Sequence, residues 1–363
     1  MAAEPTAATG PEPELVPNGA ADLTAAWLTE ALAPSFGGAA VVEVESRPIG
    51  TGQVAETRRL ALTWDRAGAG PESVVAKVPS PAPASRAAAR AVRTYEIEAG
   101  FYRDIAATVD VRRPACWCAR WDPDTDAYVV VLEDLAPAEP GDQLGGCSVD
   151  EATLAVAELV ELHAPRWGDQ TLPNLDWLSA PSPETAALFG ALLSGVLPGF
   201  LDRFATKVDG DVLALAERFV PKVQKYLVGW DGPLTVAHGD FRLDNLLFGG
   251  PRVAVVDWQT VGIGPGTADL AYFLGGSLPP DERAAHERDL VRDYHRRLAS
   301  RGVDQSWEDC WAGYRRHALG GLLMAILASQ LVERTDRGDA MFTVMAAHAG
   351  RHALDLDSES FLD

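Results

Sequence analysis

Two short apolar runs that end in polar clusters constrain this chain more than any other feature of its sequence. Leu234 to Ala237 leads into His238-Gly239-Asp240, and Val253 to Val256 leads into Asp257. Burying an uncompensated carboxylate costs several kcal/mol, so such residues either pair with cations or belong to a site. The two strand ends are therefore the first candidates for a functional site.

The spacing within the first cluster points to a particular chemistry. Asp240 and Asn245 lie five residues apart after His238, which is the H-x-D-x-x-x-x-N spacing of kinase catalytic loops. Kinases keep a second metal-binding aspartate after another strand, and Asp257 follows such a strand. Carboxylate and amide oxygens suit a hard divalent ion such as magnesium. The alternative is a polar turn with caps and surface ion pairs, because the spacing alone occurs by chance in many chains.

A kinase also needs a strand lysine for the phosphates and a helix glutamate that pairs with it. Lys77, in the strand predicted from Ser73 to Val78, is the only lysine among the first 206 residues. In the helix predicted from Ser85 to Thr108, Glu98 falls on the apolar stripe, where an unpaired carboxylate would be costly. We therefore expect Glu98, rather than Glu96, to pair with Lys77. The alternative for Lys77 is an edge-strand lysine that discourages aggregation.

Gly50 and Gly52 stand between two predicted strands, where a phosphate-covering hairpin would lie. Glycines let backbone N–H groups approach an anion closely, so both are candidate nucleotide-binding residues. Their position, rather than their pattern, favours this interpretation. A full G-x-G-x-x-G is missing, and an ordinary hairpin turn is the alternative.

Four runs of the sequence together resemble a known family. The run HGDFRLDNLLF, then VAVVDWQTVGIGPGTADLAYFL, with VVVLEDLAPAEPGDQLGGCS and LVELHAPRWG upstream, resembles the aminoglycoside phosphotransferase-like kinases. Within that superfamily the chain is most similar to the ecdysteroid kinase-like, choline-kinase-like branch, over roughly residues 45 to 350. The resemblance implies an α+β, protein-kinase-like two-lobed fold, with a small β-rich N-lobe that carries one long helix and a larger, mostly helical C-lobe. It also implies ATP and Mg²⁺ as cofactors and phosphorylation of a hydroxyl group on a small molecule.

The resemblance implies roles for single residues as well. Asp240 would be the catalytic base and Lys77 the phosphate-binding lysine. Asn245 and Asp257 would be the magnesium ligands. The remaining implied positions are structural supports at His238 and Asp269, and an adenine-contacting hinge over residues 132–135 with contacts at Glu133 and Leu135.

Other functions are weaker alternatives. Only 11 residues separate Asp257 from Asp269, which leaves little room for the activation loop of a protein kinase. An antibiotic-inactivating enzyme that phosphorylates an aminoglycoside or a macrolide is the runner-up, although Trp258-Gln259 stands where many aminoglycoside relatives carry an acidic residue. A pseudokinase or ligand-binding scaffold is disfavoured because every chemical position is filled.

The expected organisation is a disordered tail over residues 1–20, an ATP-binding lobe over 21–136 and a catalytic, substrate-binding lobe over 137–363. The predicted strands cover 39–48, 57–64, 73–78 and 128–132. A capping box at Ser148 and Glu151 opens a helix that carries His163 on one face, where it would be either a core residue or a support for the catalytic loop. Further helices are predicted over 184–204, 211–227, 281–301, 307–333 and 340–354.

Composition limits the partners. The net charge of −21 opposes binding to nucleic acid and to anionic membranes, because like charges repel. The longest apolar stretch, Ala318 to Val332, is shorter than a membrane span needs. The start of the chain lacks the features of a secretory signal, and the four cysteines form no CxxC pair, so we expect a cytoplasmic protein with reduced thiols. The expected partner is a small hydroxyl-bearing acceptor, and the sequence leaves the oligomeric state open.

Overall fold

The structure is a computed structural model that describes residues 15–50, 54–332 and 334–363. The chain folds into two compact units. The N-terminal unit holds residues up to Thr108 together with Arg113–Pro137 and Val256–Thr260, and the C-terminal unit holds Val109–Arg112, Ala138–Val255 and Val261–Asp363. The segment that carries Asp257 therefore belongs with the N-terminal unit, although it follows the catalytic-loop sequence in the chain. Most of the tail predicted over residues 1–20 lies outside the described residues.

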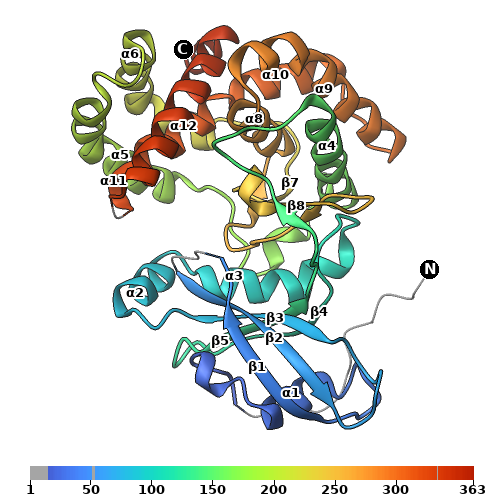
Figure 1. Ribbon diagram of the computed structural model, residues 1–363. Helices are drawn as coiled ribbons and strands as arrows, with labels where there is room; N and C mark the ends of the chain where they lie inside the picture. The colour runs from blue at the N-terminus through green and yellow to red at the C-terminus, as the bar shows by residue number, and fades with distance from the viewer. Residues whose placement is uncertain (1–14, 51–53, 333) are drawn as a thin grey trace. The chain divides into compact units, whose positions relative to one another are not determined.

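An antiparallel sheet forms the centre of the N-terminal unit (Figure 1). In the described part of the chain its strand order is β1-β2-β3-β5-β4. The strands are β1 (Val41–Pro48), β2 (Ala55–Trp64), β3 (Ser73–Pro79), β4 (Cys116–Trp121) and β5 (Tyr128–Glu133). Four of them agree in position with the strands predicted from alternating or continuous apolar residues, and β4 was not predicted.

The two faces of this sheet contact different helices. Helix α1 (Ala25–Leu32), whose N-terminus is capped by the Thr24 side chain, packs with Val74, Ala76 and Val78 of β3 in one hydrophobic core. Side chains of a strand alternate between faces, so Lys77 points to the opposite face. That face meets α3 (Thr94–Gly100), as the Lys77–Glu98 contact demonstrates.

The long helix predicted from residue 85 to residue 108 is interrupted. The structure has α2 (Pro83–Ala91), then α3, then a π-helix, η2 (Phe101–Ile105), and a short 3-10 helix, η3 (Ala106–Thr108). Arg93 lies between α2 and α3 with φ 58°, a left-handed conformation that no regular helix contains. The apolar stripe over residues 95–105 is preserved, since Tyr95, Glu98, Tyr102 and Ile105 are all buried, although η2 begins within it at Phe101.

Helices dominate the C-terminal unit (Figure 1). They are α4 (Val149–His163), α5 (Pro183–Phe204), α6 (Gly210–Phe219), α7 (Val223–Val228), α8 (Gly266–Ser277), α9 (Pro280–Ser300), α10 (Trp307–His317), α11 (Leu319–Leu331) and α12 (Asp336–Asp355). Short strands accompany them: β7 (Thr235–Ala237) pairs with β10 (Gly262–Gly264), and β8 (Leu246–Phe248) lies between β6 (Glu139–Pro140) and β9 (Ala254–Val255). The fold class predicted from the sequence, a small β-rich part and a larger helical part, is confirmed.

The helices of this unit differ from the sequence expectation at three places. The helix predicted over 211–227 is divided into α6, a 3-10 turn over Val220–Lys222 and α7. The helix predicted over residues 307–333 is divided at Ala318 into α10 and α11, and residue 333 lies outside the described part of the chain. Helix α8 was not predicted, because its sequence, GTADLAYFLGGS, contains three glycines, which are poor helix formers. Tertiary packing overrides that propensity, since nine of its twelve residues are buried.

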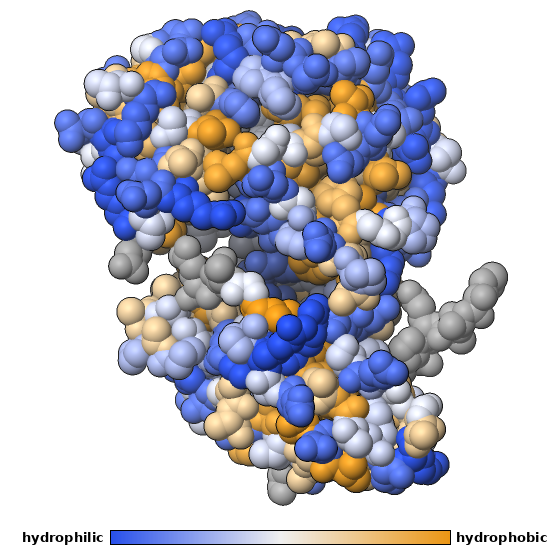
Figure 2. Space-filling view, in the orientation of Figure 1, coloured by the Kyte–Doolittle hydropathy of each residue, from blue (hydrophilic) through white to orange (hydrophobic). Residues whose placement is uncertain are grey.

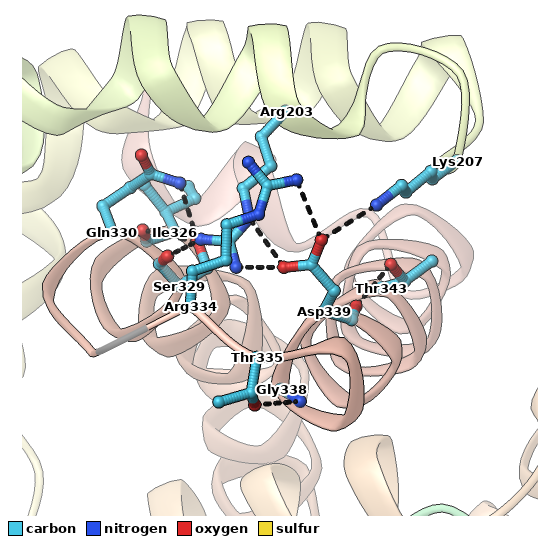
Figure 3. Close-up of polar contacts among 10 residues, drawn as sticks. All are labelled: Arg203, Lys207, Ile326, Ser329, Gln330, Arg334, Thr335, Gly338, Asp339 and Thr343. Atoms are coloured by element: carbon cyan, nitrogen blue, oxygen red, sulfur yellow. Dashed lines mark hydrogen bonds and ion pairs between the residues drawn. The ribbon is translucent and has the colours of Figure 1, made fainter.

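An ion-pair cluster joins α5 to α12 (Figure 3). Asp339, in the first turn of α12, accepts hydrogen bonds from Arg203 Nε at 3.1 Å, from Lys207 Nζ at 3.2 Å and from Arg334 at 3.1 Å. Arg203 also donates to the carbonyl oxygen of Ser329, in α11. One carboxylate thus fixes the C-terminal end of α5 to the connection between α11 and α12.

Helix α5 is long and apolar enough to cross a membrane by length and composition, a test that core helices of soluble proteins also pass. Only 22% of its most apolar 18-residue window is buried, and Leu188 is 73% exposed. On the face of the C-terminal unit drawn in Figure 2, apolar residues lie in separate patches among hydrophilic ones. The longest apolar stretch of the sequence lies elsewhere, at residues 318–332.

Candidate active site

Lys77 is the centre of a polar cluster in the N-terminal unit. Its Nζ lies 2.7 Å from Glu98 Oε1 and 2.9 Å from Asp257 Oδ1. The lysine is 9% exposed and Glu98 is completely buried. Burial alone would lower the pKa of Lys77, but Asp257 and Glu98 outweigh it and raise the pKa above its ordinary value. Lys77 is therefore a fixed cation on the face of the sheet that meets α3.

Glu98 is held by more than the lysine. Its Oε2 accepts a short hydrogen bond from the Tyr128 hydroxyl, at the start of β5, and another from Gln259 Nε2 at 3.1 Å. Glu96, the other candidate partner, instead pairs with Arg93 at 2.7 Å. The helix-face argument thus selected the glutamate that contacts Lys77. Tyr128 and Gln259 were not predicted as partners of Glu98. Val130 pairs with Lys77 across β3 and β5, and Tyr128, two residues before Val130, lies on the same face of the sheet as Lys77.

Asp257 has an unusual backbone conformation. Its φ is 67°, in the left-handed region that few residues other than glycine adopt. The neighbouring Trp258 is completely buried and stacks on Phe101 of η2, with ring centroids 3.9 Å apart. Such conformations persist only where the surroundings impose them. The packing of Trp258 against η2 thus holds the residue that follows Asp257, and the Asp257 carboxylate contacts Lys77.

The catalytic-loop sequence forms a second cluster, in the C-terminal unit. Among the described residues, three groups donate to the Asp240 carboxylate: Arg242 Nε at 3.1 Å and Asn245 Nδ2 at 3.0 Å to Oδ2, and Tyr272 Oη at 3.1 Å to Oδ1. The Asp240 side chain is 26% exposed. The loop therefore presents an oriented carboxylate that solvent or a ligand can reach.

Asp269 connects this loop to the helices behind it. Its Oδ2 accepts from the backbone N–H of His238 at 2.7 Å, and its Oδ1 accepts from that of Gly239 at 3.0 Å. His163, completely buried, places Nε2 3.2 Å from Asp269 and Nδ1 2.8 Å from the Tyr294 hydroxyl. Burial alone would raise the pKa of Asp269, but these hydrogen bonds, led by the one from His163, keep it below its ordinary value. His163 is thus both a core residue and a support of the loop.

The loop that follows β6 also holds the catalytic-loop segment. Gln143 Oε1 accepts from Leu243 N at 2.9 Å, and Gln143 Nε2 donates to the Gly276 carbonyl at 2.7 Å. Asp244 accepts a hydrogen bond from Arg242 and a long one from Gln143 N, at 3.4 Å. These contacts make Asp244 a brace for the loop. Gln143 was not predicted from the sequence, because a glutamine in a polar loop carries no periodic signal.

The remaining predicted positions lie in the N-terminal unit. Gly50 is in the connection between β1 and β2, with φ 69°, and Gly52 lies outside the described residues. Glu133 ends β5, where its Oε2 accepts from Ala115 N at 3.1 Å, and Leu135 follows the strand in a half-buried position. Gly50, Glu133 and Leu135 therefore occupy the hairpin and strand end at which the sequence placed them.

The donor chemistry of both units fits magnesium. Asp257 offers a carboxylate whose side chain is 41% exposed. Asn245 uses its amide nitrogen toward Asp240, with bonds to the carbonyl oxygen and to Oδ2, which leaves the amide oxygen as a possible ligand atom. Carboxylate and amide oxygens are ligands of hard divalent cations.

Comparison with known proteins decides the family. Residues 48–307 match the phosphotransferase enzyme family. The chain belongs to the phosphotransferase enzyme family. The matched segment contains both clusters, from Lys77 to Asp269, so the polar residues described above lie within the part of this phosphotransferase that defines its family.

Solved structures show the fold of this phosphotransferase. Choline kinase from Cryptosporidium parvum Iowa II is 11% identical, with a TM-score of 0.56 and coverage of 87% of this chain and 89% of that one. A putative aminoglycoside phosphotransferase from Ralstonia eutropha is 18% identical, with a TM-score of 0.52 and coverage of 90% and 98%. The ternary complex of APH(2")-IIa with streptomycin and ATP is 15% identical, with a TM-score of 0.51 and coverage of 89% and 94%.

The superfamily assignment made from the sequence is confirmed by the family match and by these folds. The assignment to the ecdysteroid kinase-like branch remains a prediction. A search of the curated proteins found no match to this phosphotransferase.

Proposed function

We propose that this phosphotransferase transfers the γ-phosphoryl group of ATP, with magnesium, to a hydroxyl group of a small molecule. The observation that carries the proposal is the contact of Lys77 with both Glu98 and Asp257. A lysine paired with a helix glutamate binds nucleotide phosphates in kinases, and an aspartate after a strand holds their metal. APH(2")-IIa, whose fold is similar, binds ATP together with streptomycin, and this supports ATP as the phosphoryl donor.

Lys77 is proposed to bind the phosphates, held in place by Glu98. Its partners keep the ammonium group charged and buried, so it acts as a positioned cation with little freedom to reorganise. Gly50 and Gly52 would cover the phosphates through backbone N–H groups, and Glu133 and Leu135 would contact the adenine ring. The roles of Gly50, Glu133 and Leu135 rest on the position of each residue between β1 and β2 or at the strand end, and the role of Gly52 rests on the sequence alone.

Asn245 and Asp257 are proposed as magnesium ligands. A bound magnesium ion would neutralise charge on the phosphate oxygens. The chain's own contribution is to orient the ligand atoms. Asn245 is fixed by the two hydrogen bonds from its amide nitrogen, and Asp257 is fixed by Lys77 and by the packing of Trp258.

Asp240 is proposed to orient the acceptor hydroxyl and to accept its proton. The Asp240 carboxylate is exposed enough for a ligand to reach and is held by Arg242 and Asn245. Phosphoryl transfer requires little covalent chemistry from the protein, so orientation and charge are the main contributions. The hydroxyl proton passes to an Asp240 oxygen as the hydroxyl oxygen bonds to phosphorus and ADP leaves.

The proposed acceptor is a small alcohol, because the similar folds include kinases named for choline and phosphotransferases named for aminoglycosides. None of the four cysteines, all of which lie in the described part of the chain, is joined in a disulfide, and this supports the expectation of a cytoplasmic enzyme. The antibiotic-inactivating alternative shares the same chemistry and differs only in the acceptor.

The test is magnesium-dependent ADP release by the purified protein with ATP and a panel of sterols, choline-like alcohols, nucleosides, sugars, aminoglycosides and macrolides. We expect release that requires one acceptor class and that is lost in Asp240→Asn, while that variant still binds ATP. Asp202→Asn, which changes an exposed aspartate of α5, is the matched control and should retain full release. Failure of the wild-type protein to bind ATP in the presence of magnesium would overturn the proposal and favour a scaffold.

A further inference from the structure

The two oxygens of the Asp240 carboxylate are in different situations. Within the described residues, Oδ2 accepts from both Arg242 and Asn245, whereas Oδ1 accepts from Tyr272 alone, at 3.1 Å. Each carboxylate oxygen has two lone pairs. Oδ2 is therefore saturated, and Oδ1 keeps one lone pair for a further donor. That donor would be the acceptor hydroxyl, so Tyr272 shares the reactive oxygen with the substrate.

Tyr272 reaches Asp240 from α8, and neighbouring residues of this helix hold the adjacent loop positions. Asp269 accepts from the backbone of His238 and Gly239, just before Asp240. Phe273 packs edge-to-face on Phe241, just after it, with ring centroids 5.4 Å apart. Residues 269, 272 and 273 are three and four positions apart and therefore lie on one face of the helix. One face of α8 thus contacts the backbone of His238 and Gly239, the Asp240 carboxylate and the Phe241 ring.

We propose that Tyr272 is a positioning residue that holds Asp240 Oδ1 in the orientation needed to accept the substrate proton. This inference rests on the proposed function of Asp240, and it adds a residue outside the H-x-D-x-x-x-x-N segment of the loop. Arg242 and Asn245 both hold Oδ2, so on their own they leave rotation about the bond to the carboxyl carbon less restricted. Tyr272 contacts the other oxygen and removes that rotation.

The chemistry of Tyr272 suits a permanent donor. Burial, followed by the negative charge of Asp240, raises the pKa of the phenol well above its ordinary value. The charged groups that face the phenol are Asp240 and Arg242 of the loop and Asp269 of its own helix. The hydroxyl therefore remains protonated and donates to Oδ1 rather than competing for the substrate proton.

The first experiment is the crystal structure of Tyr272→Phe beside that of the wild-type protein. We expect the Asp240 carboxylate to adopt a rotated or second conformer in the variant, while the Asp269 contacts to the loop backbone remain. This readout needs no acceptor, so it separates the present inference from the proposed function. An Asp240 side chain in the same single conformer in both proteins would overturn the inference.

The second experiment measures turnover with the acceptor found in the panel. Because a small misplacement of a reacting group can cost about 100-fold in rate, we expect Tyr272→Phe to lower kcat by roughly 10- to 100-fold with little change in KM for ATP. Tyr272→4-aminophenylalanine, which keeps an N–H donor at the same place, should restore kcat. Tyr272→4-methylphenylalanine, which keeps only the volume, should not.

A matched control is Tyr226→Phe. Tyr226 is also a buried tyrosine of this unit, and its hydroxyl donates to the His317 carbonyl at 3.3 Å, away from the loop. We expect it to retain wild-type kcat. Equal kcat losses in Tyr226→Phe and Tyr272→Phe, or equal activities of the amino and methyl variants, would reduce Tyr272 to an ordinary packing residue and would contradict the inference.

Discussion

Lys77 Nζ and Glu98 Oε1 are 2.7 Å apart, although the two residues come from a strand and a helix separated by 21 positions in the chain. Both side chains are buried, and Tyr128 and Gln259 complete the hydrogen bonding of the carboxylate. A buried pair is costly to break, because the remaining charge loses its partner. The Lys77–Glu98 contact is therefore both a proposed nucleotide-binding element and a structural requirement of the N-terminal unit.

Glu98→Gln should weaken both stability and nucleotide binding. Removing one charge from a buried pair costs about 3 kcal/mol of unfolding free energy. Lys77 then lies closer to Asp257, so we expect ATP affinity to fall roughly 10-fold, equivalent to about 1.4 kcal/mol. Urea unfolding and calorimetric titration with ATP measure the two effects. Glu96→Gln, two residues away on the same helix, is the control and should change stability by less than about 0.5 kcal/mol; equal effects of the two substitutions would refute the assignment.

Gln259→Glu should destabilise the N-terminal unit. Gln259 Nε2 donates to Glu98 Oε2 at 3.1 Å, so a glutamate there would bring two carboxylates together in a buried environment. We expect a loss of about 2 kcal/mol in unfolding free energy. Gln259→Met removes the hydrogen bond without adding charge and should cost about 1 kcal/mol. Denaturant unfolding compares the variants, and a Gln259→Glu protein as stable as wild type would show that the contact with Glu98 is absent in solution.

Gly266→Ala should disturb the support behind the catalytic loop. A Cβ at this first residue of α8 would lie 2.6 Å from the Tyr294 hydroxyl and 2.8 Å from His163 Nδ1. Those two groups must move, and we expect a stability loss of about 1–3 kcal/mol together with reduced turnover. Gly195→Ala, in α5 with open space around it, is the control and should be neutral or slightly stabilising. Thermal unfolding distinguishes them; a neutral Gly266→Ala would contradict the packing described here.

The acid side of the stability profile should depend on Asp339 (Figure 3). The hydrogen bond from Arg203, with those from Lys207 and Arg334, lowers the pKa of Asp339 from 3.8 to about 2. A carboxylate with a lowered pKa stabilises the fold above its unfolded value, and this contribution is lost as pH falls through the folded value. Asp339→Asn should therefore lower Tm at pH 7, and the difference from wild type should narrow between about pH 4 and pH 2. A difference that stays constant over this range would show that the carboxylate charge is not what joins α5 to α12.

Sequence patterns indicated candidate site residues where chemistry and periodicity coincided. Lys77 stood out because lysine is rare in this chain, and Glu98 stood out because a carboxylate on an apolar stripe needs a partner. The strand ends before His238 and Asp257 were visible as apolar runs followed by acids. The superfamily and the fold class were implied by the resemblance of four sequence runs to a known family, and both are confirmed. The roles assigned to single residues remain predictions.

Contacts made only by tertiary packing were not visible. Tyr128, Gln143 and Tyr272 meet their partners across 30, 100 and 32 positions of sequence, and nothing in the local pattern of any of them marks a polar contact. The apolar stripe predicted one continuous helix, but the left-handed conformation of Arg93 divides it into α2 and α3. Strand β4, CWCARW, lacks clear alternation and pairs with β5 through a register irregularity, so its pattern could not be recognised.

The most direct test of the proposed phosphotransferase activity is to detect the transferred phosphoryl group on a product. The protein would be incubated with magnesium and ATP labelled with ¹⁸O in the γ-phosphoryl group, in the presence of a mixed pool of small hydroxylated compounds. Mass spectrometry would then identify any compound that carries the labelled phosphoryl group. We predict at least one such product with the wild-type protein and none with Asp240→Asn, although that variant still binds ATP. Labelled product formed equally by both proteins would contradict the role of Asp240, and ATP binding by the wild-type protein with no labelled product would contradict the phosphotransferase account.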